Sequence, residues 1–472
     1  MKLNTIQRLA GLALAVLIAG APLGALAQTA PTAPAAAPAA GAPAAPVAAS
    51  AAPAAPATAA PAPKIDTGDT AWMLTSSVLV LMMTIPGLAL FYAGMVRKKN
   101  ILATLAQSFG ATCVITVLWM VIGYSLAFTG SGKYIGDFKY FLLAPMGLNA
   151  TSSLAPTIPE SVYMMFQMTF AIITPALIAG ALADRMKYSA FLLFMAAWLL
   201  LVYCPVAHWV WGGGWLGAAG ALDYAGGTVV HLNAGTAGLV AAIMLGKRKG
   251  LGTENMAPHN LAYSVIGASL LWVGWFGFNA GSAVTSNVNA GMAMVATQIA
   301  TAGAALAWMA AEWIIAKKPS VLGMVSGAVA GLVAITPASG FVDPKGALII
   351  GLTAGVVCYI AAVHLKKIFG YDDALDCWGV HGVGGALGAI MTGMFASKVI
   401  NPTGAPKGGW LIDGNIGQMV LQLEDVGVTF FYCGVVTFLI LLVLKYTIGI
   451  RVSEEVEVEG LDINLHGEIV HG

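Results

Sequence analysis

The chain has 472 residues, of which 58% are hydrophobic and only 9% are charged. A soluble globular chain carries about 25% charged residues, so most of this protein's surface must meet lipid, and a soluble fold is excluded. The net charge of +1 also argues against a nucleic-acid partner, which would need a basic patch. We therefore expect an all-α polytopic membrane protein.

The N-terminus has the layout of a secretory leader followed by a linker. In residues 1–27, Lys2 and Arg8 precede or flank a short apolar run, and Ala25-Leu-Ala27 offers a cleavage site, as in a signal peptide. Residues 28–65 are rich in Ala and Pro, and proline favours an extended chain without internal hydrogen bonds. We interpret this segment as an extracytoplasmic tether.

Eleven apolar segments follow, each long enough to cross a hydrocarbon core of about 30 Å, some with tilt. They are residues 71–96, 101–128, 161–183, 188–208, 226–246, 259–280, 290–315, 321–338, 346–365, 378–396 and 425–448. The predicted membrane domain is residues 66–450, and residues 451–472 form a C-terminal tail.

Basic residues indicate how these spans are oriented, because they collect on the cytoplasmic side of a membrane. Most of them follow the odd-numbered spans, namely Arg97, Lys98, Lys99, Arg185, Lys187, Lys247, Arg248, Lys249, Lys317, Lys318, Lys366, Lys367, Lys445 and Arg451. The N-terminus is then outside and the C-terminus cytoplasmic, which agrees with a signal peptide and with the cell inner membrane as location.

An internal repeat relates the first five spans to the next five. His231 follows Asp223 by eight positions, and His381 follows Asp373 by eight, each within Val-His. A second echo is Phe-Tyr-Ala-Gly at 91–94 against Phe-Asn-Ala-Gly at 278–281. Each repeat contains five spans, the first over about 71–246 and the second over about 259–396. A final helix of about 425–448 lies outside the repeats. Five is odd, so the copies are inverted, as in many transporters.

The two histidines occupy equivalent positions in opposed halves, so they can meet near the pseudo-twofold axis. Ionisable groups inside a membrane usually mark a pathway, and we predict that His231 and His381 line a pore, although a structural role for each stays open. No carboxylate or Cys completes a metal site with them. Asp223 and Asp373 are placed to cap the helices that follow, and the charge of Asp223 also suits attraction of a cation.

Aromatic residues and a hydroxyl gather at the predicted outer ends of several spans. Phe166 and Phe170 are four residues apart on one helical face, Trp211 lies in His-Trp-Val-Trp-Gly-Gly-Gly, and Ser282 ends a run from Trp275. Aromatic faces and a hydroxyl acceptor suit a small cation. The alternative is that Trp211 belongs to an interfacial aromatic belt.

These residues resemble the Amt/MEP/Rh ammonium transporter family, its bacterial Amt branch in particular. The resemblance is carried by FQMTFAIITPALIAGALADR (166–185), HWVWGGG (208–214), ALDYAGGTVVHLNAG (221–235), GWFGFNAGS (274–282), AGLVAITPASG (330–340), DDALDCWGVHGVGG (372–385) and RVSEEVEVEGLDINLHGE (451–468). Trp378 departs from the Phe that is usual there.

The resemblance implies a role for each of these positions. Trp211, Phe170 and Ser282 would form the outer ammonium site, and Phe166 with Phe170 the gate. His231 and His381 would be the pore histidines, and Asp223 the structural acid. It also implies a homotrimer and a PII-type signal protein bound at the cytoplasmic face. Trp211 argues against an Rh-type neutral gas channel.

The function that we expect is ammonium transport. We predict that ammonium is recruited outside, loses a proton, and crosses as ammonia, with separate proton transfer favoured over net ammonia flux. An ammonium sensor remains the alternative from another class, although only about 20 residues follow Arg451. No nucleophile–base constellation indicates an enzyme, and we expect no metal and no cofactor. The five cysteines form no Cys-x-x-Cys pair and are interpreted as buried apolar residues.

Overall fold

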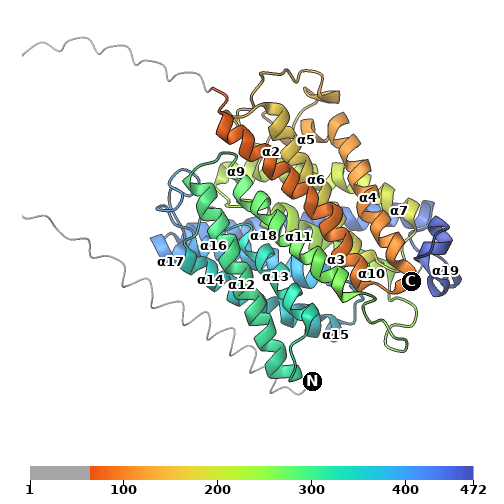
Figure 1. Cartoon of the computed structure of the whole chain (residues 1–472). Coiled ribbons are helices and arrows are strands. Elements are labelled where there is room, and N and C mark those ends of the chain that lie inside the picture. Colours follow the sequence, from red (N-terminus) through yellow and green to blue (C-terminus); the bar gives the residue numbers. More distant parts are fainter. Residues whose placement is uncertain (1–63, 471–472) are drawn as a thin grey trace, which may run out of the picture.

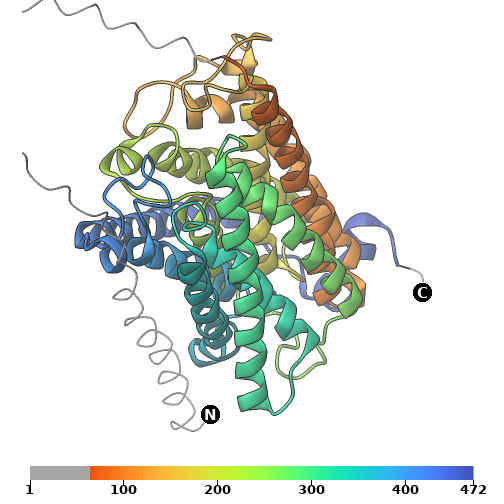
Figure 2. The same ribbon diagram turned by 60° about the vertical axis from the view of Figure 1, so that its left-hand side comes forward.

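The computed structural model describes residues 64–470, and this part of the chain folds into helices without a β-strand. The long helices pack side by side in one bundle (Figures 1 and 2). Nine helical segments of the described part are long and apolar enough to cross a membrane. They are Thr67–Met95 (α2, η2, α3), Lys98–Phe128 (η3, α4, η4, α5), Glu160–Leu182 (α6), Tyr188–Ala219 (α7, η6, α8, α9), Gly227–Leu245 (η7, α10), Leu261–Gly281 (α11), Val288–Ala316 (α12), Pro344–Phe369 (α14, η8, α15) and Ile416–Thr447 (α18). The predicted signal peptide and most of the tether lie outside the described residues.

Two of the eleven predicted spans are shorter helices. Val321–Ile335 (α13) has 15 residues, and the segment predicted at 378–396 consists of Trp378–Gly382 (η9) followed by Val383–Phe395 (α16). The count of eleven therefore stays a prediction.

The last long helix begins earlier than its apolar pattern indicates. It starts at Ile416 and not near residue 425, because two polar side chains in its first turns have partners in a neighbouring loop. Gln418 donates to the carbonyl of Gly220 at 2.9 Å, and the Gln422 side-chain oxygen accepts from the Leu222 amide at 2.7 Å. Glutamines with such partners are compatible with a buried helix, but they hide its start from a hydropathy pattern.

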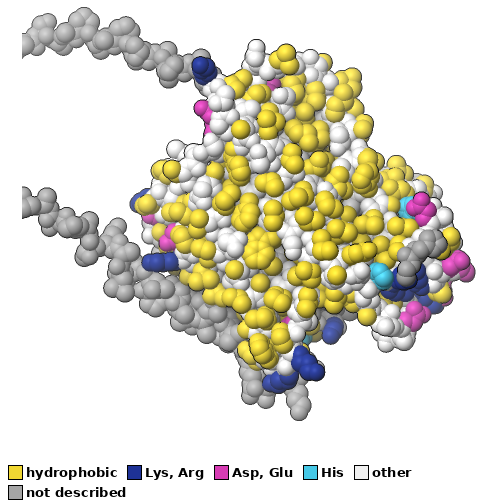
Figure 3. Space-filling view, viewed as in Figure 1, with side chains coloured by type: hydrophobic (Ala, Val, Ile, Leu, Met, Phe, Trp, Pro, Cys, Tyr) yellow, Lys and Arg dark blue, Asp and Glu magenta, His cyan; other side chains and the backbone are white. Residues whose placement is uncertain are grey.

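On the face shown in Figure 3 the bundle is largely apolar, and charged side chains lie toward its ends. Helix α6 forms the centre, since nearly all of its side chains are buried.

The cysteine prediction was wrong in one case, because Cys113 is exposed while the other four cysteines are buried. Its helix, α4 (Ile101–Leu118), exposes an apolar face that includes Phe109 and Val117.

Charged residues at one end of the bundle form a buried ion-pair network. Arg248 contacts Asp372 at 2.9 Å and Asp184 at 3.4 Å, and Arg97 contacts Asp184 at 3.1 Å. Burial alone would raise the pKa of Asp372, but hydrogen bonds and charge from Arg248 outweigh it and hold that pKa below its usual 3.8. The network ties together four connections between helices.

Replacing Arg248 should destabilise the protein strongly, because Arg248→Met leaves the buried Asp372 carboxylate without its ion-pair partner, while Asp184 keeps only Arg97. Breaking a buried pair in this way costs about 3–5 kcal/mol, to be measured as unfolding in detergent. Lys247→Met is the matched control, since Lys247 is exposed and makes no ion pair within residues 64–470.

The pH dependence gives a second readout of the same variant. In the native protein, the low pKa of Asp372 contributes stability above about pH 3.8, and this contribution is lost as the pH falls through the lowered pKa. In Arg248→Met the unpaired Asp372 carboxyl group is best tolerated when protonated, so the difference in stability from wild type should narrow in acid. A gap independent of pH would contradict the network.

The C-terminal tail folds back onto the bundle. It contains Glu454–Glu459 (α19) and Asp462–His466 (η10). The Asp462 carboxylate accepts from the amides of Leu102 and Ala103 at the start of α4, at 3.0 and 2.8 Å, and Glu457 contacts Arg451 at 2.7 Å. Two of the tail's acidic residues are thus buried in the protein's own contacts, and the exposed ones are Glu454, Glu455, Glu459 and Glu468.

Candidate functional site

The two predicted pore histidines lie against each other in the interior. Their Nδ1 atoms are 3.3 Å apart, and the ring centroids are separated by 5.4 Å. Both side chains are buried, at 1% and 3% exposure. One Nδ1 must donate and the other accept, so the pair is oriented by a shared proton. The Nε2 atom of His231 has no partner among the described residues.

Each histidine is placed by a helix of the same construction. His231 lies in η7 (Gly227–Leu232), which continues as α10, and His381 lies in η9, which continues as α16. In both cases a short π-helical segment precedes a 13-residue α-helix.

Aspartates hold the starts of these two helices. Asp223 accepts hydrogen bonds from the amides of Gly226, Gly227, Thr228 and Val229 at 2.6–3.1 Å. Asp373 accepts from the amides of Cys377 and Trp378 at 3.1 and 2.7 Å. Otherwise unpaired N–H groups at a helix start are satisfied in this way, and the position of each histidine follows from its aspartate.

An aromatic stack extends from the histidine pair to the predicted gate. Trp275 stacks on His231 with centroids 5.3 Å apart, and Phe278 lies 5.9 Å from the same ring. Phe278 in turn stacks on Phe170 at 4.2 Å, and Phe170 contacts Phe166 at 4.9 Å. Sequence reasoning missed Trp275 and Phe278, although their spacing of three residues places them on one helical face.

A cavity of about 270 Å³ opens on the far side of this stack. All three predicted outer-site residues, Trp211, Phe170 and Ser282, line it. The Trp211 ring stands perpendicular to that of Phe170, with centroids 5.8 Å apart. The Ser282 hydroxyl donates to the Phe278 carbonyl at 2.8 Å, which leaves its oxygen lone pairs available as acceptors.

The same cavity has polar lining residues that the sequence analysis did not assign. The side-chain oxygen of Gln167 is buried without a partner among the described residues, and Tyr163 lies beside it. Tyr224 lines both this cavity and a neighbouring one of about 310 Å³, which also contains Asp223 and Ser282. Oxygen atoms and aromatic faces therefore surround the entrance.

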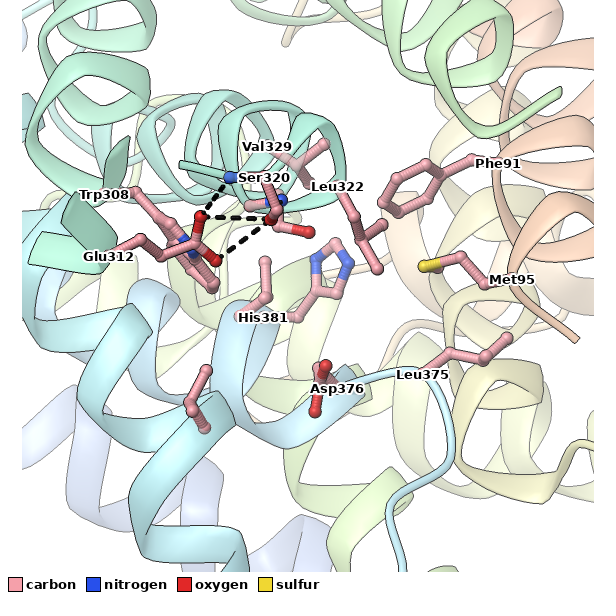
Figure 4. Close-up of a pocket in the computed structure, with 14 residues that line it drawn as sticks. Phe91, Met95, Trp308, Glu312, Ser320, Leu322, Val329, Leu375, Asp376 and His381 are labelled. Carbon is pink, nitrogen blue, oxygen red and sulfur yellow. Dashed lines mark hydrogen bonds between the residues drawn. The ribbon is translucent and has the colours of Figure 1, made fainter. Parts of the chain in front are cut away.

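Another cavity, of about 120 Å³, lies on the His381 side of the histidine pair, and Figure 4 shows the residues that line it. His381 lines it together with Phe91, Leu322 and Val329, and the carboxylates of Glu312 and Asp376 lie at its edge. Phe91, the sequence echo of Phe278, is thus placed near His381 as Phe278 is near His231. The histidines stand between the two cavities.

Residues 64–470 contain no group of three His, Cys, Asp or Glu side chains that could hold a metal ion. An apolar helical bundle with a buried histidine pair between two cavities has the features of a membrane transport protein.

Comparison with known proteins shows to which family of transport proteins the chain belongs. The family model of the Ammonium Transporter Family matches residues 71–471, and the chain therefore belongs to that family. It is 49% identical over 401 residues to the ammonium transporter of Bacillus subtilis, covering 85% of this chain and 98% of that one.

Solved structures agree with this assignment. The crystal structure of Candida albicans Mep2 matches with a TM-score of 0.78 and 37% identity, covering 83% of this chain and 87% of that one. A structure described as a sensor Amt protein matches with a TM-score of 0.77 and 28% identity, covering 84% and 98%.

Proposed function

We propose that this ammonium transporter recruits ammonium in the outer cavity, removes one proton at the aromatic stack, and passes ammonia along the histidine pair to the inner cavity. The observation that carries the proposal is the buried contact between His231 and His381, with an aromatic cavity on one side and a second cavity on the other. Trp211, Phe170 and Ser282 bind the cation, and Phe166 and Phe170 form the gate.

The energetics favour ammonium over other cations of similar size. Moving a small cation from water into a medium of low dielectric costs of order 20 kcal/mol in the idealised Born picture, and a desolvated aromatic ring returns about 2 kcal/mol. Ammonium can instead release a proton. With the lysine pKa of about 10.4 as an upper stand-in, this costs roughly 4.6 kcal/mol at pH 7. Potassium has no such route.

The proton travels separately along the histidine pair in our proposal, which makes transport electrogenic. Net ammonia flux without charge transfer is the competing form. An ammonium-evoked current in proteoliposomes, with potassium as control, tests the proposal. Ammonium uptake without current would establish neutral transport. If neither current nor uptake is observed, the sensor function is the remaining candidate, and the likeness to the sensor Amt protein favours it.

The topology that goes with this function has eleven membrane helices in two inverted five-helix repeats and a final helix. The N-terminus is outside and the C-terminus cytoplasmic, in a homotrimer in the inner membrane. Met95 lines the inner cavity, and Arg97, two residues further along the chain, belongs to the ion-pair network with Arg248. Because basic residues collect on the cytoplasmic side, this supports a cytoplasmic position for the inner cavity. Residues 1–27 are a signal peptide, and residues 28–65 a tether.

A PII-type signal protein is proposed to dock at the cytoplasmic face. Because Glu457 and Asp462 are buried in contacts within the chain and Glu454 pairs with Lys249, the tail's exposed acids without an ion pair in the described chain are Glu455, Glu459 and Glu468. Replacing Glu455 and Glu459 with glutamine should weaken capture of a PII-type protein in a pull-down while ammonium transport persists. Unchanged capture would exclude this part of the tail.

Replacing Ser282 with alanine should raise the ammonium concentration needed for half-saturation. A hydrogen bond to a charged partner is worth about 1.5–3 kcal/mol, which corresponds to roughly 10- to 150-fold in affinity. Ser269→Ala is the matched control, because Ser269 makes the same bond to the carbonyl four residues earlier on α11 but is exposed outside the cavity. Equal half-saturation in the two variants would remove Ser282 from the site.

A further inference from the structure

A second carboxyl group lies next to Asp223 in the interior of the bundle. Asp425, on the long helix α18, is completely buried. Its Oδ2 atom is 3.0 Å from the Thr228 hydroxyl oxygen, and that oxygen is 2.7 Å from Oδ2 of Asp223. Thr228 therefore stands between two carboxyl groups that come from segments almost 200 residues apart.

Counting hydrogens shows that this arrangement needs an additional proton. A threonine hydroxyl has one hydrogen to donate, and an ionised carboxylate can only accept. The hydroxyl cannot donate fully to both acids, so one of them must carry a proton and donate to Thr228. Two ionised carboxylates joined by a single hydroxyl would otherwise be buried together without a cation, at a large free-energy cost.

The surroundings decide which acid carries the proton. Asp223 accepts four backbone amides in addition to the hydroxyl, and such a set of donors stabilises the ionised form. Asp425 has only Thr228 and a long contact of 3.4 Å to Thr429. The other titratable groups on α18 and on the elements packed against it make no hydrogen bond or ion pair with Asp425 in the described chain: Glu424, Tyr432, Cys433, Lys445, Tyr446, His231, Asp413, Tyr188 and Tyr203.

We propose that Asp425 is a protonated carboxylic acid that donates to Thr228, so that Thr228 donates to Asp223 and fixes the start of the helix that carries His231. The pair Asp223 and Asp425 then holds a single negative charge. Asp425 acts as a positioning residue for His231, because two hydrogen bonds through Thr228 connect it to Asp223, which caps the helix. This last consequence rests on the proposed pore function, whereas the proton on Asp425 does not.

Infrared spectroscopy of the purified full-length protein in lipid tests the proton directly. A protonated carboxyl group gives a carbonyl band above the amide bands, and this band shifts in D₂O. We expect that band in wild type and its loss in Asp425→Asn, while Glu424→Gln, a change at the neighbouring exposed acid, leaves it unchanged. A spectrum in which Asp425→Asn removes only ionised-carboxylate absorption would overturn the proposal.

Transport by two variants tests the positioning role. Asparagine can still donate to Thr228 and has the charge of the protonated acid, so Asp425→Asn should keep flux and half-saturation within about twofold of wild type. Asp425→Leu has a similar size but no donor, and flux should fall several-fold with the protein still folded. If the asparagine variant loses as much flux as the leucine variant, Asp425 does not act through a neutral donor. The infrared result stands whether or not His231 lines a pore.

Discussion

His231→Asp should convert the protein from a selective ammonium transporter into a pore that also conducts potassium. In the proposed mechanism the histidine pair is neutral and gives a cation no fixed countercharge, whereas an ionised aspartate would attract one by about 4 kcal/mol at 4 Å for an effective dielectric near 20. The carboxylate would also draw water between Trp275, Phe278 and His381, which now pack around His231. Ammonium and potassium could then cross without losing a proton.

Potassium flux into proteoliposomes at two pH values measures this effect. The competing outcome is that burial keeps the new carboxyl group neutral, in which case the pore closes at low pH and conducts potassium only at high pH. His259→Asp is the control, because His259 lies in a loop beside Arg97 and Lys98 and lines neither pore cavity. Absence of potassium flux at high pH in His231→Asp would sink the proposed selectivity mechanism.

Gly235→Val should separate the two halves of the site and abolish transport. A Cβ atom at residue 235 would lie 2.1 Å from the Gly382 nitrogen and 2.3 Å from its Cα. These are backbone atoms next to His381, and they cannot turn aside as a flexible side chain can. Overpacking of this kind costs about 1–3 kcal/mol, occasionally more, and the shift moves η9 away from η7 and widens the histidine contact.

The measurements are thermal stability in detergent and ammonium flux in proteoliposomes. Gly235→Ala is the milder version, which keeps the test informative if the valine variant does not fold. Gly427→Ala on α18 is the matched control, since a Cβ there meets no atom within 4 Å. Equal stability and flux in Gly235→Ala and Gly427→Ala would contradict the close approach of the two halves.

The sequence was sufficient to predict an all-helical membrane fold and to relate the two histidines to each other. Long apolar stretches must form helices in lipid because every backbone polar group needs an internal partner. The repeated Asp–Val-His spacing then related His231 to His381 across 150 residues, and the structure places their nitrogens 3.3 Å apart. The start of α18 escaped this reasoning because Gln418 and Gln422 interrupt its hydropathy.

Only the tertiary structure identified the residues whose role depends on distant partners. Asp425 in a sequence is one acid on an apolar helix, and it becomes informative when Thr228 brings it next to Asp223. Trp275 and Phe278 gain their place in the stack in the same way. Hydropathy and spacing are local or periodic properties that the chain itself encodes. Contacts between segments 150–200 residues apart depend on how helices pack, which no pattern along one segment determines.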